Sequence, residues 1–440
     1  MRTSTLPMAL KPTIAKPAAL PSPIALLPPT ATMQVAGSIR PVPPAIQCES
    51  AILVDAISGQ VLYAKNADER RPMASTTKIM TALVLCENAG ETDIVCASEY
   101  AASIKDSSLH LKKGEKLTVK DLLRAVLMRS ANDGCVAAAE HVAGNEVAFV
   151  EKMNARAAEL GATHTHFTNP HGLHNPEHYT TARDLATIAR AAMQNARICD
   201  VVKRLKTKIA RSTNSRDVTM NNHSVKFLKH FPGADGIKTG WTVPAGHCFV
   251  GSTTWGGWRL ISVVLKSKNY VQDTSALMKF GYQNFTVHKL AKSGAIVGEC
   301  MVNGGNEPKV FAMTQFPVQI VLPKASESRV ESQMELPLVN APLAYGAPIG
   351  SMKIFIDGVP VLSSPLLSNA AVEATPGFAN SVRQGNPWKT AALVATIFGA
   401  GLVSLRYGKR YRTRIAKIAK NARIGGRRLA KSFRNSNHDR

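Results

Sequence analysis

Within residues 47–284, strand-like segments stand at both ends and helical patterns fill the interval. A hairpin of two strands is predicted by two apolar runs and a Ser58-Gly59 turn in AILVDAISGQVLYAKNA. Three more strands are predicted by GIKTGWTV, HCFVGSTTW and WRLISVVLKS, the last two joined by Gly256-Gly257 in a tight hairpin. The order of strands, helices and strands predicts an α/β (α+β) fold in which a sheet is flanked by a helical subdomain.

Several segments between these strands have the apolar spacing of amphipathic helices. An apolar helix is expected from Ile79 to Cys86, directly after Ser75. In TVKDLLRAVLM, Thr118 and Asp121 are spaced as a capping-box pair, which predicts a helix start. Residues 146–160 and 181–194 predict two further helices.

The pattern changes after residue 284. Short alternating runs such as VQIVLP, MELPLV and MKIFIDGVPVL are separated by Gly, Pro and Asn. Residues 285–370 are therefore expected to form a small all-β domain. Residues 371–387 are polar and contain Pro and Gly, which predicts a linker.

The formal net charge of +24 is concentrated near one end of the chain. Residues 406–440 contain thirteen Lys and Arg but a single acidic residue. They follow WKTAALVATIFGAGLVSLRY, an apolar stretch long enough for a helix to cross a bilayer, with Trp388 and Tyr407 suited to its two interfaces. We therefore expect a C-terminal transmembrane helix at 388–407 and a basic cytoplasmic tail at 408–440; a buried helix with a basic extension is the alternative. This topology puts the rest of the chain on the extracytoplasmic (periplasmic) side of the cell inner membrane and makes nucleic acid an unexpected partner.

The amino end has the charge arrangement of an export signal without its helix. Arg2, Lys11 and Lys16 precede an uncharged stretch, but ten prolines stand before Ala45. We treat residues 1–46 as an export or disordered segment. Seven scattered cysteines form no Cys-x-x-Cys pair, so they predict no zinc site and leave the redox compartment undecided.

Ser75-x-x-Lys78 brings a hydroxyl and an amine onto one face of a helix, because residues three apart are neighbours there. Serine is a poor nucleophile until a base removes its proton, and a lysine can be that base if burial and a second cation lower its pKa. A helix cap followed by a surface lysine is the alternative for this pattern alone.

Two further motifs follow in order. Ser130-Ala131-Asn132 stands where a predicted helix ends, whereas the similar Ser212-Thr213-Asn214 lies in a polar stretch close before the next motif. Lys238-Thr239-Gly240 ends an edge-like strand with a cation, a hydroxyl and a residue that permits close backbone approach. The first two of these groups suit an anionic substrate terminus.

The three motifs together are typical of penicillin-binding proteins and class A β-lactamases. Residues 48–370 resemble the low-molecular-mass penicillin-binding D-alanyl-D-alanine carboxypeptidases, a serine peptidase family. Further blocks carry the likeness: DAISGQVLYAKNADERRPMASTTKIMTAL, NPHGL, HYTTARDLA, GADGIKTGWTVPAGHC and LPLVNAPLAYGAPIGSMKIFIDG. The resemblance implies the transpeptidase fold shared by serine β-lactamases and penicillin-binding proteins, followed by a β domain and a carboxy-terminal anchor.

It also implies removal of the terminal D-alanine from peptidoglycan stem peptides ending in D-Ala-D-Ala, through an acyl-enzyme, with β-lactams as covalent inhibitors and without cofactor or metal. The residues that match the family's motifs would then divide the chemistry. Ser75 would be the nucleophile and Lys78 its base. Ser130 would be a proton relay held by Lys78, Asn132 and Lys238, and Asn132 would orient the peptide. Lys238 and Thr239 would face the terminal carboxylate, Gly240 would permit close approach, and the N–H groups of Ser75 and Trp241 would form the oxyanion hole.

One position departs from the family. Several relatives carry an arginine that helps hold the carboxylate shortly before a helix, where this chain has KSKNYVQD with Tyr270 near that place. Lys266 and Lys268 are the candidate substitutes.

Parts of the sequence are also compatible with three other functions. His174 to His178 fits the zinc-protease pattern His-x-x-Glu-His, but Asn175-Pro176 favours a loop bordering the site over the helix which that chemistry needs. Glu151-x-x-Asn154 resembles the deacylating motif of a β-lactamase but lies on a predicted amphipathic helix. A non-catalytic scaffold that binds peptidoglycan is the third possibility, although no catalytic part is lacking.

Overall fold

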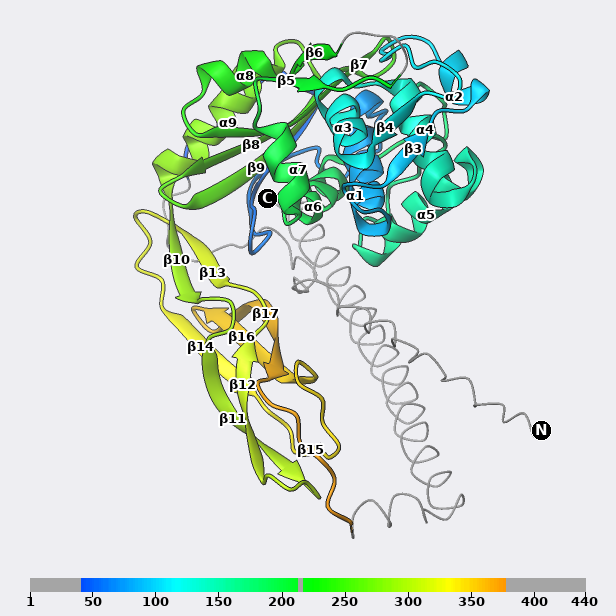
Figure 1. Cartoon of the computed structure of the whole chain (residues 1–440). Coiled ribbons are helices and arrows are strands. Elements are labelled where there is room, and N and C mark those ends of the chain that lie inside the picture. Colours follow the sequence, from blue (N-terminus) through cyan, green and yellow to red (C-terminus); the bar gives the residue numbers. More distant parts are fainter. Residues whose placement is uncertain (1–40, 213–216, 377–440) are drawn as a thin grey trace, which may run out of the picture. The chain divides into compact units, whose positions relative to one another are not determined.

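The computed structural model describes residues 41–212 and 217–376 (Figure 1). The predicted membrane span 388–407 and basic tail 408–440 lie outside these residues, as does nearly all of the predicted export segment 1–46. None of the helices within the described ranges is long and apolar enough to cross a membrane. The described residues form two compact units: residues 41–212 and 217–300 with 310–337 and 345–369, and residues 301–309 with 338–344 and 370–376.

A five-stranded antiparallel sheet is assembled from both ends of the catalytic segment, as predicted. Its order is β2-β1-β9-β8-β7, so that β7 is an edge strand. Gly256 and Gly257 connect β8 to β9 with φ of +57° and +72°, angles that a tight two-residue turn requires and glycine adopts without strain. The strands are β1 Ser50–Asp55, β2 Val61–Lys65, β7 Ala234–Thr242, β8 Gly246–Trp255 and β9 Trp258–Ser267.

Both faces of this sheet are covered by helices. Ile52 and Val54 belong to the larger core, which includes α6, whereas Ala51 and Leu53 belong to a second core with α9. Because successive strand residues point to opposite faces, α6 and α9 cover opposite sides. The helices are α1 Lys78–Asn88, α2 Glu99–Ser103, α3 Val119–Arg124, α4 Asn132–Ala143, α5 Glu146–Glu159, α6 Ala182–Ala192, α7 Ala196–Val202, α8 Val225–His230 and α9 Tyr270–Asn284.

The predicted helical subdomain is formed by α1 to α5, which gather beside the sheet in Figure 1. The side chain of Thr118 accepts a hydrogen bond from the N–H of Asp121 at 3.1 Å, which confirms the predicted helix start. The segment after Thr118 is helical to its end, as predicted, but α3 ends at Arg124 and continues as a π-helical turn at Ala125–Arg129. Two short strand pairs are separate from the five-stranded sheet. They are β3 Ile94–Cys96 with β4 Lys116–Thr118, and β5 Lys206–Ile209 with β6 Val218–Asn221.

Strands dominate after residue 284, as predicted. In the first unit, β10 Phe285–Ala291 pairs with β13 Val318–Pro323, and β14 Val330–Glu335, β16 Pro348–Ile356, β17 Val359–Ser368 and β12 Lys309–Thr314 follow one another in an antiparallel sheet. In the second unit, the end of β11 Ile296–Asn303 pairs in parallel with β15 Val339–Asn340. Bridges at Val372 and Ala374 carry β-pairing past the predicted start of the linker at 371.

The carboxylate of Asp55 is a buried hydrogen-bonding centre at the end of β1. It accepts the N–H and hydroxyl of Ser58 at 2.6 and 2.7 Å and the indole N–H of Trp258 at 2.8 Å. Its fourth donor is the amide of Gln319 on β13, also at 2.8 Å. The side chain of Gln60 bonds the N–H and C=O of Val321 at 2.8 and 2.6 Å, so β13 is joined to the first hairpin by side-chain hydrogen bonds.

Candidate active site

Ser75 and Lys78 meet where a 3-10 turn, Ala74–Thr77, passes into α1. The amine of Lys78 lies 2.9 Å from the Ser75 hydroxyl oxygen, as their spacing predicts. Lys78 is fully buried, which excludes the alternative of a surface lysine behind a helix cap. The pair has the geometry of a nucleophile and its base.

Two further oxygens surround the Lys78 amine. The side-chain oxygen of Asn132 lies 2.8 Å away, and the carbonyl of His171 accepts a third hydrogen bond. Burial lowers the pKa of Lys78 to about 8, an effect that the nearby Asp133 carboxylate partly opposes. A protonated amine would donate to all three oxygens, whereas a neutral amine donates to two and can accept the Ser75 proton with its lone pair.

The edge strand β7 lies directly against the start of α1. A Cβ added at Gly240 would stand 2.8 Å from the Ser75 nitrogen and 3.0 Å from the Thr76 nitrogen, closer than real Cβ atoms tolerate. Position 240 therefore lies where β7 closely approaches the start of α1, and only glycine permits this approach. Gly172 makes a similar approach from the other side: its Cβ would overlap the Ala74 carbonyl, and its φ is +87°.

Ser130 and Asn132 are positioned by the end of the π-helical turn. Ser130 closes that turn with φ of +65°, and the N–H of Asn132 donates to the Ser107 carbonyl at 2.6 Å. The expected hydrogen-bond network is formed only in part: Asn132 reaches Lys78, but within residues 41–212 and 217–376 no hydrogen bond joins the Ser130 hydroxyl to Lys78 or Lys238. Ser130 is nevertheless buried.

Asp133 is a structural residue that the sequence analysis did not identify. Its carboxylate accepts the Ser108 hydroxyl at 2.6 Å and the N–H groups of Leu109 and Leu111 at 3.0 Å. These bonds fix the loop that supplies the Ser107 carbonyl to Asn132. Only its place directly after Asn132 could have drawn attention to it.

Lys238 is buried within β7, and Thr239 is half-buried beside it. The expectation that Lys-Thr-Gly ends the strand is wrong, because β7 continues to Thr242. Burial, and then the charge of Lys78, hold the pKa of Lys238 well below its usual value, and its amine donates to the Thr239 carbonyl at 2.8 Å. Trp241 is 58 % exposed, with its ring 6.4 Å from that of His247.

The residues 171–178 form a loop that borders this site, as predicted. His178 bonds the Thr77 hydroxyl at 2.8 Å through Nε2 and accepts the Thr168 N–H at 3.0 Å through Nδ1. Burial lowers the pKa of His178 to about 4 and that of His171 to about 3, so both rings are neutral near pH 7. His174 and His178 are not on a helix, and the described residues contain no cluster of His, Cys, Asp and Glu suited to a metal.

The β-lactamase motif is not assembled. Glu151 is exposed on α5. Asn154 bonds the backbone of Phe167 through both its oxygen, at 2.8 Å, and its nitrogen, at 2.9 Å, which is a structural role.

Lys266 and Lys268, the candidate substitutes for the family arginine, form no hydrogen bond or ion pair with Lys238 or Thr239 among the described residues. Lys266 forms an ion pair with Glu49 at 2.8 Å, and Lys268 is exposed. The Tyr270 ring packs against His247 and Phe249, with centroid distances of 5.9 and 5.2 Å.

The chain is similar in sequence and fold to several known proteins. Residues 38–269 match the family described as D-alanyl-D-alanine carboxypeptidase, and residues 285–374 match the C-terminal domain of penicillin-binding protein 5. The carboxypeptidase DacF of Bacillus subtilis is 33 % identical over 73 % of this chain and 84 % of its own length. DacA of Haemophilus influenzae is 34 % identical over 74 % and 85 %. The crystal structure of penicillin-binding protein 5 from Haemophilus influenzae superimposes with a TM-score of 0.61 and 32 % identity, covering 76 % of this chain and 99 % of that one.

Proposed function

Because the chain belongs to the D-alanyl-D-alanine carboxypeptidase family and is a serine hydrolase, we propose that it releases the terminal D-alanine of peptidoglycan stem peptides through an acyl-enzyme on Ser75. The observation that carries this mechanism is the 2.9 Å contact between the Ser75 hydroxyl and the buried Lys78 amine. The pKa of about 8 leaves part of the Lys78 population neutral at pH 7. That fraction can act as the base.

Acylation begins when neutral Lys78 takes the Ser75 proton and the oxygen attacks the carbonyl carbon of the D-Ala–D-Ala bond. Negative charge then develops on the carbonyl oxygen. The N–H groups of Ser75 and Trp241 are the proposed donors to it. The close approach of Gly240 to the Ser75 nitrogen supports this pairing, because it brings the backbone of β7 beside that N–H.

The tetrahedral intermediate collapses when the C–N bond breaks and D-alanine leaves as an amine that needs a proton. Ser130 passes that proton from Lys78, and Asn132 orients the peptide. Lys238 and Thr239 receive the terminal carboxylate. Although burial lowers the pKa of Lys238, an arriving carboxylate favours its protonated form, so substrate and proton bind together.

Hydrolysis completes the reaction. Water attacks the ester carbon while the neutral Lys78 amine takes a proton from it. The ester C–O bond then breaks, Lys78 returns that proton to the Ser75 oxygen, and the shortened peptide leaves as an acid with Ser75 restored. A β-lactam follows the same first step, but its amide nitrogen remains attached to the ring, so it does not diffuse away. The acyl-enzyme then persists, and we propose that penicillin labels Ser75 covalently.

The carboxy-terminal segment completes the proposal. Residues 388–407 would anchor the protein in the cell inner membrane, with the basic tail 408–440 in the cytoplasm and the catalytic residues on the periplasmic side. The apolar stretch between two interface aromatics and a basic stop is the support for this arrangement.

A labelling and turnover experiment tests the catalytic proposal. The wild type should bind fluorescent penicillin covalently and release D-alanine from a D-Ala-D-Ala peptide, and Ser75→Ala should do neither. Ser103→Ala, an exposed serine of α2, is the matched control and should behave as wild type. Labelling without D-alanine release would instead support a non-catalytic scaffold, and labelling of Ser75→Ala would place the nucleophile elsewhere.

A further inference from the structure

A second concave site lies at the β8–β9 turn, between α9 and the start of β10. Its volume is about 680 Å3, within the range of small-molecule and saccharide pockets. Aromatic rings supply much of its wall, and lysines stand at its rim. The residues that carry the argument are Trp255, Trp258, Lys279, Tyr282, Phe285 and Lys324.

This pocket is separate from the catalytic residues. Gly240 pairs with Cys248 near one end of β8, whereas Trp255 pairs with Trp258 at the other end. At about 3.3 Å per strand residue, the two positions are roughly 23 Å apart along β8. A ligand in the pocket would therefore leave the catalytic serine accessible.

The aromatic wall combines fixed rings with one exposed ring. The hydroxyl of Tyr282 lies 2.9 and 3.1 Å from the carbonyl oxygens of Thr253 and Trp258, which share its one proton. The indole N–H of Trp258 donates to the Asp55 carboxylate. Trp255 packs beside Tyr282, with ring centroids 5.9 Å apart, yet is 59 % exposed. Its indole N–H has no hydrogen-bond acceptor among the described residues, so both a ring face and a donor are available to a ligand.

The rim of the pocket carries positive charge alone. Lys279 and Lys324 are exposed and form no ion pair within the part of the chain that the structure describes. The amine of Lys289 lies close by, 3.6 Å from where a Cβ of Gly257 would be. No acidic side chain lines the pocket, so its electrostatics favour a ligand with negative charges.

We propose that this pocket binds the glycan strand of peptidoglycan, with Trp255 stacking on a sugar ring and the lysines holding carboxylates of the attached peptides. The C–H faces of a hexose are apolar enough to cover an indole, while its hydroxyls accept from the indole N–H. A protruding strand can enter a concave site, whereas a bilayer surface is flat, which favours a polymer strand over a membrane surface. The inference rests on the proposed function, because the same polymer carries the stem peptides.

Such a site would act by effective concentration. A glycan strand held at Trp255 keeps neighbouring stem peptides near the catalytic serine, so polymeric substrate binds more tightly than a free peptide of the same sequence. The pocket would therefore lower the KM for the polymer without changing kcat, and it would leave short, sugar-free peptides unaffected.

Sedimentation with insoluble peptidoglycan tests the proposal with the full chain in detergent. The stem peptides are trimmed of their terminal D-alanine beforehand, so that the catalytic site contributes no substrate binding. Trp255→Ala and Lys279→Glu should each weaken binding about ten-fold. Tyr345→Ala, which removes another ring that is 67 % exposed, and Lys152→Glu on α5 are the matched controls and should bind as wild type.

Turnover separates this proposal from the catalytic one. Trp255→Ala should release D-alanine from a short peptide at the wild-type rate and show a raised KM only with polymer. If neither the wild type nor any variant releases D-alanine from the short peptide, the catalytic proposal is refuted. Sedimentation still tests the pocket in that case. Wild-type sedimentation of Trp255→Ala would overturn the glycan site. The glycan site would also be overturned if Trp255→Ala lost binding to vesicles containing phosphatidylglycerol while its sedimentation with peptidoglycan stayed unchanged. The pocket would then be a membrane contact.

Discussion

The pH dependence of acylation should follow the protonation of Lys78. At pH 7, a lysine with the ordinary pKa of 10.5 is neutral in roughly one molecule of three thousand, whereas a pKa of about 8 makes roughly one in eleven neutral. Burial of Lys78 thus raises the population of the base by nearly 300-fold, on the order of 3 kcal/mol. The second-order rate of acylation by a fluorescent penicillin should rise about ten-fold per pH unit below pH 7 and level off near pH 8.

Substitution of Lys78 by arginine tests this reasoning directly. Lys78→Arg keeps a cation in place, but a guanidinium stays protonated and cannot accept the Ser75 proton. Acylation should therefore fall by at least about a thousand-fold at every pH between 6 and 9. Lys238→Arg is the matched control: it also replaces a buried amine, but Lys238 is needed as a cation, so part of the activity should remain.

The alkaline side of the profile reports on Lys238. Burial and the charge of Lys78 lower its pKa, so the rate constant for free enzyme and penicillin should fall once Lys238 loses its proton. Because the two amines interact, the two apparent pKa values of the bell belong to the pair. A rate that stays constant between pH 6 and 8, or a Lys78→Arg enzyme that acylates within ten-fold of wild type, would refute the assignment of Lys78 as the base.

Two further substitutions and one deletion have expected effects on acylation, folding stability and membrane attachment. Gly240→Ala should slow acylation about a hundred-fold, because its methyl group would stand 2.8 Å from the backbone nitrogen of Ser75. Gly134→Ala, whose methyl group would have contacts of 3.4 Å or longer, should acylate at the wild-type rate. Equal acylation rates for the two variants would contradict the close approach of Gly240. Arg211→Met removes the cation from a buried ion pair with Glu115 and should destabilise folding by about 3–5 kcal/mol, so an unchanged melting temperature would refute the role of that pair. Deletion from Trp388 onward should yield an active protein that leaves washed membranes, and its retention there would refute the proposed anchor.

Local interactions were the part of this molecule that the sequence could predict. Ser75 and Lys78 are one helical turn apart, and Thr118 caps a helix whose N–H group lies three residues later, so spacing alone determines both contacts. The antiparallel hairpins follow from alternation and paired glycines in the same way. Each of these contacts joins residues that are close together in the sequence.

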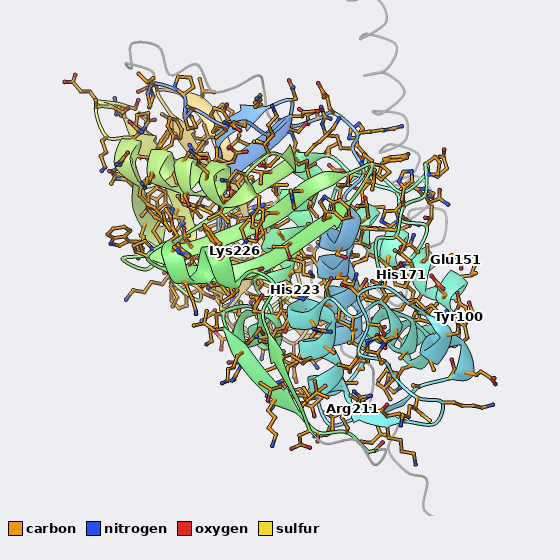
Figure 2. All side chains as sticks on the ribbon, turned by 90° about the horizontal axis from the view of Figure 1, so that it is seen from above. Tyr100, Glu151, His171, Arg211, His223 and Lys226 are labelled. Atoms are coloured by element: carbon orange, nitrogen blue, oxygen red, sulfur yellow. The ribbon has the colours of Figure 1, made fainter. Side chains whose placement is uncertain are left out.

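Contacts across long chain separations could not be predicted from such patterns. The carbonyl that completes the surroundings of the Lys78 amine belongs to His171, 93 residues away, and a backbone carbonyl has no residue-type signature. The buried pair of Arg211 and Glu115 joins segments 96 residues apart. The π-helical turn at Ala125–Arg129 likewise depends on packing, since its sequence is that of an ordinary helix. Figure 2 shows Arg211 and His171 at separate places in the folded chain.

The hydrogen bonds at Asp55 should also govern how the protein unfolds. Opening β13 would withdraw the Gln319 amide from a buried carboxylate and break both bonds between Gln60 and Val321, and buried groups that lose their partners raise the free energy of the partly open state. β13 should therefore belong to the same cooperative unfolding unit as the five-stranded sheet. Although Val321 lies more than fifty residues beyond the last strand of that sheet in sequence, its amide hydrogen should exchange with solvent as slowly as that of Val54.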